Sequence, residues 1–258
     1  MVSYEIIGNK EKAVAIIESS NLLKKDKKFA SEIVKKIKSV QSVLVKTSKR
    51  YGILRKRKYK LLLGNKNTEI IHSEHNSLLK LDPQKVYFSP RELTERQKIA
   101  HQARQREKIL VLFSGIGPYI IAIKKVQPST TVYGIELNKY AHQYAKENIK
   151  LNKLENVVLI HGNVKKEVPR LKLKFDRIIM PLPKTAGKYL SLAFKKIKNN
   201  GIINYYTWGK DEDYDSIKAE IKMESEKIKK KIKILNITKV LPYAPKVYKL
   251  RVDIKCLK

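Results

Sequence analysis

Two shortages restrict what this chain can be: it has little negative charge and almost no cysteine. Only 24 of its 258 residues are Asp or Glu, and Cys256 is the sole cysteine. One cysteine excludes an internal disulfide framework and a zinc site built from several thiolates, so we expect no disulfide partner and a reducing, cytoplasmic location. No apolar run approaches the roughly 20 residues of a membrane span, and no signal-like segment follows Met1, so we expect no membrane association.

The scarcity of acids leaves a large excess of positive charge. Against the 24 Asp and Glu stand 57 Lys and Arg, which gives a formal net charge of +33. Self-repulsion on this scale is tolerable when a polyanion neutralises it, so nucleic acid is the expected partner. A lysine-rich thermophile surface is the alternative, but that composition usually raises Glu together with Lys, and here Glu is not raised.

A phosphate-binding loop is also missing. No Gly-Lys-Ser/Thr sequence of the Walker type occurs, and the turn containing Gly115 and Gly117 lacks the third glycine of a dinucleotide site. The turn nevertheless follows an apolar strand at 109–113, and the next strand, at 131–135, ends on Glu136, where an acid accepts hydrogen bonds from ribose hydroxyls. The pattern favours S-adenosylmethionine, which carries adenosine without phosphate. An ordinary βα turn followed by a chance acid is the alternative.

The pattern divides the chain near residue 85. Residues 1–84 predict a small basic α+β domain, in which a strand pair, a helix, a third strand and an alternating basic run precede a hairpin that turns at His75 and Asn76. The expected elements are strands at 4–7, 12–17 and 43–46, a helix at 28–38, the basic run at 55–60, and hairpin strands at 68–72 and 77–81.

Residues 85–258 predict an α/β domain with the Rossmann-like, seven-stranded sheet of a class I methyltransferase. Its first helix is expected to begin at an N-cap on Ser89 or Thr94. The expected strands are 109–113, 131–135, 159–163, 177–180 and 202–207, followed by a terminal pair at 232–240 and 248–255, with helices at 189–197 and 214–230.

Segments spread along the chain match the pattern of one enzyme family: 6–8, 52–55, 86–96, 113–119, 135–138, 147–153, 180–184, 203–207 and 243–245. Together they resemble the archaeal and eukaryotic tRNA (guanine-N1)-methyltransferases that act at position 37, beside the anticodon. The resemblance covers nearly the whole chain. It implies methyl transfer from S-adenosylmethionine to N1 of a guanine in tRNA.

The resemblance also implies two catalytic residues. Guanine N1 carries a proton, so its methylation needs a general base and a group that holds the charge developing on O6. The Thr-Glu-Arg sequence of the family makes Glu95 the base, and the segment at 52–55 makes Arg55 the O6 partner. The alternatives are a helix N-terminal acid favoured by the dipole for Glu95, and a phosphate-binding cation for Arg55.

The remaining implied residues bind the cofactor or the tRNA, and no metal site is expected. The cofactor set is Arg91, Phe113, Ser114, Gly115, Gly117, Tyr119, Glu136, Leu137, Asn163, Pro181, Leu182 and Pro183. The tRNA set is Arg55, Arg57, Lys58, Arg96 and Lys184. The resemblance implies that residues 1–84 contribute to tRNA binding and to the active site. We expect a monomer that binds the anticodon arm.

Three features depart from the family pattern. Pro181 stands where the family commonly has Asn before Leu-Pro-Lys, and Asn163 replaces an acid that partners the adenine. An amide can still bond to the adenine edge. Many members also carry an N-terminal domain that grips the tRNA elbow, and the sequence shows no counterpart, so we expect recognition through the anticodon arm and diffuse charge.

Other functions stay open. The wybutosine-pathway aminocarboxypropyl transferases share the fold and the cofactor, but they typically lack the Arg of Ser-Pro-Arg and the Leu-Pro-Lys segment, which are present here as Arg91 and 182–184. Some archaeal methyltransferases of the family also methylate C7 of a tricyclic guanosine derivative, which the change at Pro181 could admit. A non-catalytic RNA-binding protein with a relic cofactor fold is the third alternative.

Overall fold

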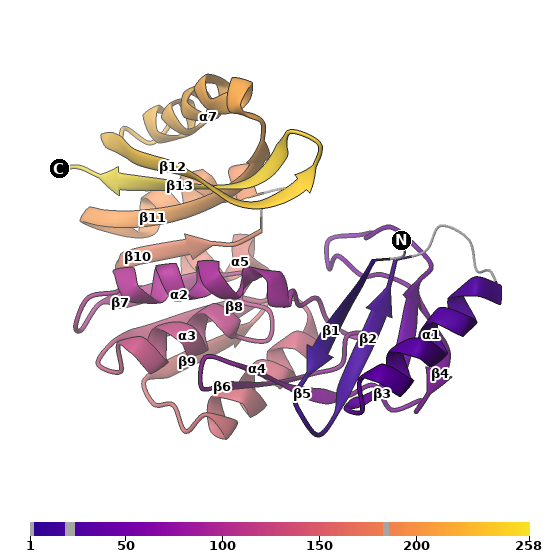
Figure 1. Cartoon of the computed structure of the whole chain (residues 1–258). Helices are drawn as coiled ribbons and strands as arrows, with labels where there is room; N and C mark the ends of the chain where they lie inside the picture. The colour runs from indigo at the N-terminus through magenta and orange to yellow at the C-terminus, as the bar shows by residue number, and fades with distance from the viewer. Residues whose placement is uncertain (1–2, 19–23, 183–185) are drawn as a thin grey trace.

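The computed structural model describes residues 3–18, 24–182 and 186–258, and three sheets organise these residues (Figure 1). The small sheet has the order β1-β2-β3-β4, and only its β2–β3 pair is parallel. One helix, α1, packs on it. Its elements are β1 (Tyr4–Gly8), β2 (Ala13–Ile17), α1 (Lys24–Lys36), β3 (Val40–Lys46) and β4 (Tyr59–Gly64).

Strand β2 is apolar throughout because both of its faces are covered. Ala13, Ala15 and Ile17 pack with residues of α1 such as Ile33. Val14 and Ile16 point to the opposite face of the sheet, into a second apolar cluster that extends to the helices of the large sheet. A strand buried on both sides reads as a continuous apolar run, which is why the sequence pattern identified it.

A hairpin follows the small sheet and is formed by β5 (Ile70–Glu74) and β6 (Ser77–Leu81). Its two connecting residues, His75 and Asn76, have φ values of 40° and 59°. Positive φ at both central positions suits the right-handed twist of the two strands, and Asn tolerates that conformation well. The hairpin predicted to turn at these residues is confirmed.

The large sheet has seven strands in the order β12-β13-β11-β10-β7-β8-β9, with β13 antiparallel to both of its neighbours. The predicted α/β class and the seven-stranded sheet are therefore confirmed. Its elements are η1 (Pro90–Glu92), α2 (Leu93–Gln102), β7 (Lys108–Leu112), α3 (Pro118–Val126), β8 (Thr131–Glu136), α4 (Lys139–Leu151), β9 (Val157–His161), α5 (Val164–Arg170), β10 (Phe175–Met180), η2 (Ala186–Tyr189), α6 (Leu190–Lys196), β11 (Ile197–Gly209), η3 (Asp211–Asp213), α7 (Tyr214–Glu226), β12 (Ile232–Ala244) and β13 (Val247–Cys256).

Helices cover both faces of the large sheet, as strand β7 shows. Ile109 and Val111 pack under α2 and α3, which lie in front of the sheet in Figure 1. Leu110 and Leu112 alternate with them and pack under α5, α6 and α7 on the opposite face. Among the described helices, none is long and apolar enough to cross a membrane.

Several predicted boundaries differ from the structure by a few residues, such as the helix predicted at 28–38, which spans Lys24–Lys36, and the strand predicted at 202–207, which spans Ile197–Gly209. Two further differences affect the site. Helix α2 has neither Ser89 nor Thr94 as its cap: Ser89 precedes the short helix η1, and Glu92 is the residue before α2. The basic run at 55–60 is only partly a strand, because β4 begins at its fifth residue. Gly52 and Arg55 both have positive φ, so the chain closes a turn there before it enters the sheet.

A buried ion pair connects the hairpin to α2. The Arg96 guanidinium donates to both oxygens of Glu74, at 2.7 and 2.5 Å, and to the carbonyl of Ser89. Burial alone would raise the pKa of Glu74, but hydrogen bonds from His72 and Arg96 and the Arg96 charge outweigh it, so the pKa is lowered. The pair, together with the apolar cluster around it, fixes the small sheet and hairpin against the large sheet.

Replacement of Glu74 should destabilise the fold strongly. In Glu74→Ala the Arg96 guanidinium stays buried without its partner, and breaking a buried ion pair from one side costs about 3–5 kcal/mol. Arg170→Ala is the matched control, because Arg170 pairs with Glu167 at the protein surface, where such pairs contribute about 0–1 kcal/mol. Urea denaturation followed by circular dichroism measures both free energies of unfolding. Equal losses in the two variants would contradict a stabilising role for the Arg96–Glu74 pair.

Candidate active site

Two adjoining cavities open at the carboxyl ends of β7, β8 and β10, which is where open α/β sheets bind their ligands. We name them the Glu136 cavity and the Glu92 cavity after a carboxylate in each. Both are closed on one side by the turn before β4, and they share five residues: Arg55, Tyr87, Phe113, Gly115 and Leu182. The two cavities therefore have a common wall formed by these five residues.

The Glu136 carboxylate is held by two backbone donors. Its Oε2 accepts from the Gly115 N–H at 2.8 Å, and its Oε1 accepts from the Asn138 N–H at 2.7 Å. Burial raises the pKa of Glu136, and these two N–H donors offset only part of that shift. The carboxylate lies at the edge of a cavity of about 400 Å³, within the roughly 300–1,000 Å³ typical of small-molecule sites.

The glycine turn leaves room for a ligand close to its backbone. A Cβ built on Gly115 meets no atom within 4 Å, and its φ is +57°. Phe113, just before the turn, has a φ of 55°, which is unusual for a bulky residue and typical of functional turns. The Ser114 hydroxyl is buried and has no hydrogen-bond partner among the described residues. Open space beside the backbone, a half-buried carboxylate and an unpartnered hydroxyl fit an adenosine-type ligand.

The other walls of the Glu136 cavity are mostly apolar, as a flat heterocycle requires. Phe113 and Tyr189 meet edge to face, with ring centroids 5.0 Å apart. Asn163 also lines this cavity and caps α5, where its Oδ1 accepts from the Lys165 N–H at 2.9 Å. The apolar and aromatic lining residues are Ile53, Leu54, Tyr87, Phe113, Leu137, Ala141, Val164, Leu182 and Tyr189.

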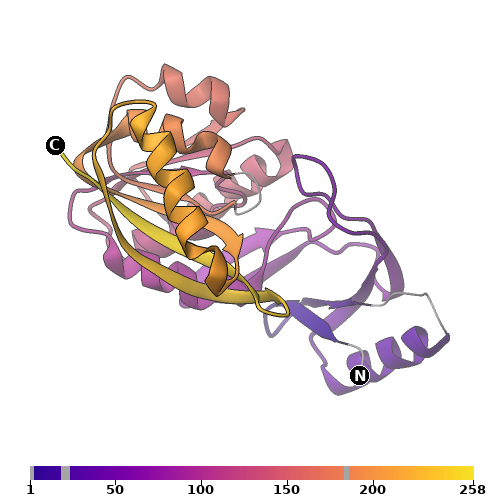
Figure 2. The same cartoon turned by 90° about the horizontal axis from the view of Figure 1, so that it is seen from above.

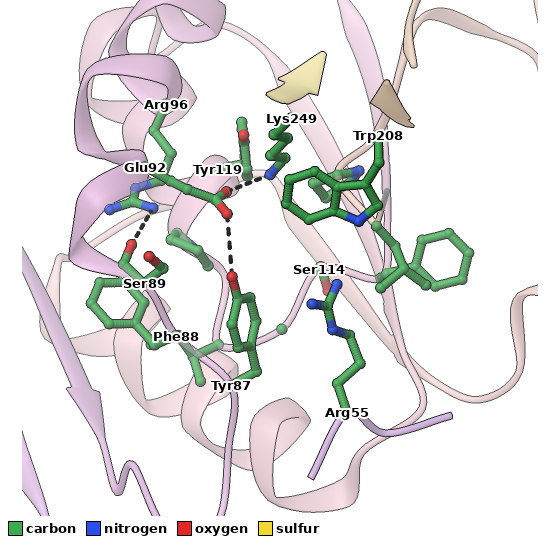
Figure 3. Close-up of a pocket in the computed structure, with 16 residues that line it drawn as sticks. Arg55, Tyr87, Phe88, Ser89, Glu92, Arg96, Ser114, Tyr119, Trp208 and Lys249 are labelled. Carbon is green, nitrogen blue, oxygen red and sulfur yellow. Dashed lines mark hydrogen bonds and ion pairs between the residues drawn. The ribbon is translucent and has the colours of Figure 1, made fainter. Parts of the chain in front are cut away.

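The Glu92 cavity contains an ion pair that the sequence analysis did not anticipate. Glu92 lies between Lys249 and Tyr87 (Figure 3). Its Oε2 accepts from the Lys249 ammonium at 2.8 Å, and its Oε1 accepts from the Tyr87 hydroxyl at 3.3 Å. The Lys249 side chain is 3% exposed, and its ammonium also lies 4.7 Å from the centre of the Tyr206 ring. The cavity thus presents a buried, hydrogen-bonded carboxylate to whatever enters it.

Glu95 does not line either cavity. It lies one helical turn after Glu92, is 4% exposed, and its Oε1 accepts from the Tyr206 hydroxyl at 2.5 Å and from Arg251 at 2.7 Å. Arg251 is held in turn by Asp253. The predicted base is therefore placed behind the cavity wall that Glu92 and Lys249 form, with a cation and a phenol as its partners.

Three arginines, Arg50, Arg55 and Arg57, form a cluster before β4, and two of them lie over the Tyr87 ring. Arg50 lies 4.2 Å and Arg55 5.2 Å from the ring centroid. The Nε atom of Arg57 is buried with no hydrogen-bond partner among the described residues. Burial lowers the pKa of Arg50, and the charges of Arg57 and Arg55 lower it further. Like charges crowded in this way favour an anion as their ligand.

Most of the predicted cofactor residues reach the two cavities. Phe113, Gly115, Glu136, Leu137, Asn163 and Leu182 line the Glu136 cavity, and Ser114, Tyr119 and Pro181 line the Glu92 cavity. Two do not: Arg91 is exposed on η1, and Gly117 precedes α3 with its Cα facing Ala145. Pro183, predicted to bind the cofactor, and Lys184, predicted to bind tRNA, lie outside the described residues.

The predicted tRNA residues divide in the same way. Arg55 lines both cavities. Arg57 belongs to the cluster with Arg50 and Arg55, and Lys58 is exposed just before β4. Arg96 is 2% exposed and paired with Glu74, and it also lines the Glu92 cavity, so its predicted contact with tRNA stays a prediction.

The sequence analysis did not name every cavity residue, and Glu92, Trp208 and Lys249 are among those it missed. One signal was available for Lys249, since a lysine beside the apolar positions of a central strand is unusual unless it is paired. Nothing local distinguishes Glu92 from other acids at the beginning of a helix, because its partner is 157 residues away.

Comparison with known proteins places the chain among tRNA-modifying enzymes. The model of the TRM5/TYW2 methyltransferase domain matches residues 70–235. The tRNA (guanine(37)-N(1))-methyltransferase Trm5b of Pyrococcus abyssi is 38% identical over 98% of this chain and 74% of its own length. The tRNA(Phe) (4-demethylwyosine(37)-C(7)) aminocarboxypropyltransferase of Methanocaldococcus jannaschii is 36% identical over 87% of this chain and 89% of its own.

Solved structures agree with this assignment. The complex of aTrm5 with tRNALeu superposes with a TM-score of 0.84 at 33% identity, over 99% of this chain and 72% of that one. The M. jannaschii TYW2 structure in complex with AdoMet gives a TM-score of 0.76 at 29% identity, over 99% and 100% of the two chains. From its sequence, its seven-stranded sheet and these matches, the chain belongs to the TRM5/TYW2 methyltransferase family.

Proposed function

We propose that this protein transfers a methyl group from S-adenosylmethionine to N1 of guanosine 37 in tRNA. The observation that carries the proposal is the pair of adjoining cavities: one fits an adenosine group, and the other holds the Glu92 carboxylate and Arg55. The relatives named above act on this nucleotide, and the net charge of +33 suits a tRNA substrate. Residues 1–84 would supply the cationic side of the tRNA site.

The Glu136 cavity would hold the cofactor. Glu136 would accept hydrogen bonds from the two ribose hydroxyls, and the apolar walls with Asn163 would bind the adenine. The turn at Gly115 has open space next to its backbone, so the methionine part can pass toward the Glu92 cavity. When bound, S-adenosylmethionine supplies the methyl group and leaves as a neutral thioether.

The Glu92 cavity would hold the guanine, whose N1 must lose a proton as it gains the methyl group. Family resemblance supports Glu95 as the base that takes this proton. Among the described residues, the hydrogen bonds to this carboxylate end on Oε1, so Oε2 is the atom for that task. Arg55 lines the same cavity and would stabilise the charge that develops on O6.

Glu92 is the competing carboxylate, because it faces the cavity while Glu95 lies behind the wall. For Glu95 to reach N1, the Glu92–Lys249 pair has to shift when the guanine enters. If it does not shift, Glu92 takes the proton and Glu95 only holds Arg251 in place. Substituting each carboxylate separately distinguishes these two mechanisms.

Transfer of the aminocarboxypropyl group from the same cofactor is the second candidate function. The 36% identity to an aminocarboxypropyltransferase supports it. A methylation at C7 of a tricyclic guanosine derivative is a third, because Pro181 lines the Glu92 cavity where the family commonly has Asn. Incubation with cofactor and tRNA, followed by mass spectrometry of the nucleosides, decides between them. N1-methylguanosine at position 37 supports the proposal, and an aminocarboxypropyl group would contradict it.

Removing Glu136 should weaken cofactor binding. Hydrogen bonds to a charged group contribute about 1.5–3 kcal/mol, so Glu136→Ala should lose about ten- to hundredfold in affinity, measured by calorimetry. The ribose donors favour the charged carboxylate, whereas burial raises its pKa in the free protein. Wild-type affinity should therefore fall as the pH drops through that raised pKa, and the variant should not show this fall. An unchanged affinity in Glu136→Ala would place the ribose elsewhere.

The two carboxylates should separate in single-turnover kinetics. Loss of a general base typically costs about 10²–10⁴-fold, so Glu95→Gln should slow methyl transfer by that factor while Glu92→Gln slows it much less. Gln can keep one hydrogen bond to Arg251 or Tyr206, and thermal unfolding checks that both variants remain folded. A slow Glu92→Gln enzyme beside a fast Glu95→Gln enzyme would identify Glu92 as the base.

tRNA affinity should depend steeply on salt, because counterions are released from each neutralised phosphate. Every phosphate contact contributes about 0.7–0.9 to the slope of log affinity against log salt. Arg50→Ala and Arg57→Ala should each flatten the slope by about this amount. Lys222→Ala is the control, since it removes the same charge from an exposed position on α7. If all three variants change the slope equally, the cluster of Arg50, Arg55 and Arg57 has no special part in tRNA binding.

A further inference from the structure

Two aromatic side chains on separate strands form a stacked pair at the edge of the Glu92 cavity. Trp208, near the end of β11, lines the cavity, and its ring centroid lies 4.2 Å from that of Tyr243, with 34° between the ring planes. Strand β13 lies between the two strands that carry them. Tyr243 therefore reaches across β13, and the pair runs from the cavity wall to the surface.

The hairpin geometry explains how Tyr243 comes to face Trp208. Pro242 pairs with Tyr248 and Ala244 pairs with Val247, so the β12–β13 ladder is irregular at Tyr243 between them. An extra residue in a strand redirects a side chain. In Figures 1 and 2 this end of the β12–β13 hairpin lies at the edge of the large sheet that faces the small one.

Tyr243 is unusually exposed for a large aromatic residue, with 67% of its surface accessible. Two cationic residues lie near it: Lys246 follows in the turn and is exposed, and Arg55 lies across the cavity (Figure 3). Lys249, on the neighbouring strand, is buried and already paired with Glu92. An exposed ring bordered by cations is the arrangement by which proteins stack unpaired nucleobases, because the cations hold the phosphates while the ring covers the base.

We propose that the Trp208–Tyr243 pair is a stacking platform for the anticodon loop: Tyr243 stacks on one nucleobase next to the base that occupies the Glu92 cavity. The inference rests on the proposed function, since it takes that cavity to hold the target guanine. It adds a determinant of loop recognition that acts outside the cavity. The partner is an unpaired nucleobase, and the contact is to its ring face, so it tolerates different bases at that position.

Trp208 provides a direct probe, because it is the only tryptophan in the chain. Its fluorescence should change when an anticodon stem-loop RNA binds, since the pair lies at the binding surface. Tyr243→Ala and Tyr243→Leu should weaken RNA binding by about five- to hundredfold, which corresponds to the energy of one stacked base. Tyr243→Phe keeps the ring and should bind within about twofold of wild type.

Controls separate stacking from damage to the hairpin. Leu235→Ala changes another exposed side chain of β12, 48% accessible, and should leave RNA affinity unchanged. Cofactor affinity and thermal unfolding should be the same in all variants. Equal losses in the Ala, Leu and Phe variants would show a role for the hydroxyl group and would overturn the stacking proposal.

Abasic substitutions in the RNA identify the stacked nucleotide. Bases flanking the target are removed one at a time, and each RNA is titrated against wild type and Tyr243→Ala. At one position the two losses should not add, because removal of either partner eliminates the same contact. Additive losses at every position would overturn the platform. Wild-type methylation of guanosine 37 is measured separately, so a failure of the proposed function is distinguishable from a failure of this inference.

Discussion

Three buried ion pairs begin from one short segment, residues 92–96, and the arrangement of both cavities depends on them. Glu92 pairs with Lys249, Glu95 with Arg251, and Arg96 with Glu74. The first two fix the segment to β13, and the third fixes it to the hairpin that packs beneath the small sheet. Removing either partner of such a pair leaves a buried charge uncompensated, so the segment is held in one position.

The charges at the opposite side of the cavities are arranged differently. Arg50 and Arg55 lie over the Tyr87 ring, and Arg57 lies in the same cluster. None of the three has a carboxylate ion-pair partner among the described residues. Paired charges around the α2 segment thus build a rigid wall, while unpaired cations before β4 remain available to an anionic ligand. The protein separates groups that maintain the structure from groups that can bind RNA, although both kinds are arginines.

Local pattern was enough to predict the sheet, the glycine turn and Glu136, because each depends on residues close together in sequence. The apolar strand before Gly115 and the acid that ends the next strand both follow from the βαβ pattern. In the structure the Gly115 N–H donates a hydrogen bond to the Glu136 carboxylate. The beginning of α2 was predicted less well. Ser89 and Thr94 are favoured cap types, yet the short helix η1 precedes α2 and leaves Glu92 at its start.

The sequence alone determined the fold class, the family and the polyanionic partner, since these follow from periodicity, from matching segments and from the count of charges. Only the tertiary structure decided which carboxylate faces the cavity, that Arg96 is a structural link, and that Tyr243 meets Trp208. Each of these depends on partners far away in sequence: Glu92 and Glu95 sit one helical turn apart, and their environments are set by β13 cations 157 and 156 residues later. Such pairings follow from the register of strands, which no local pattern encodes.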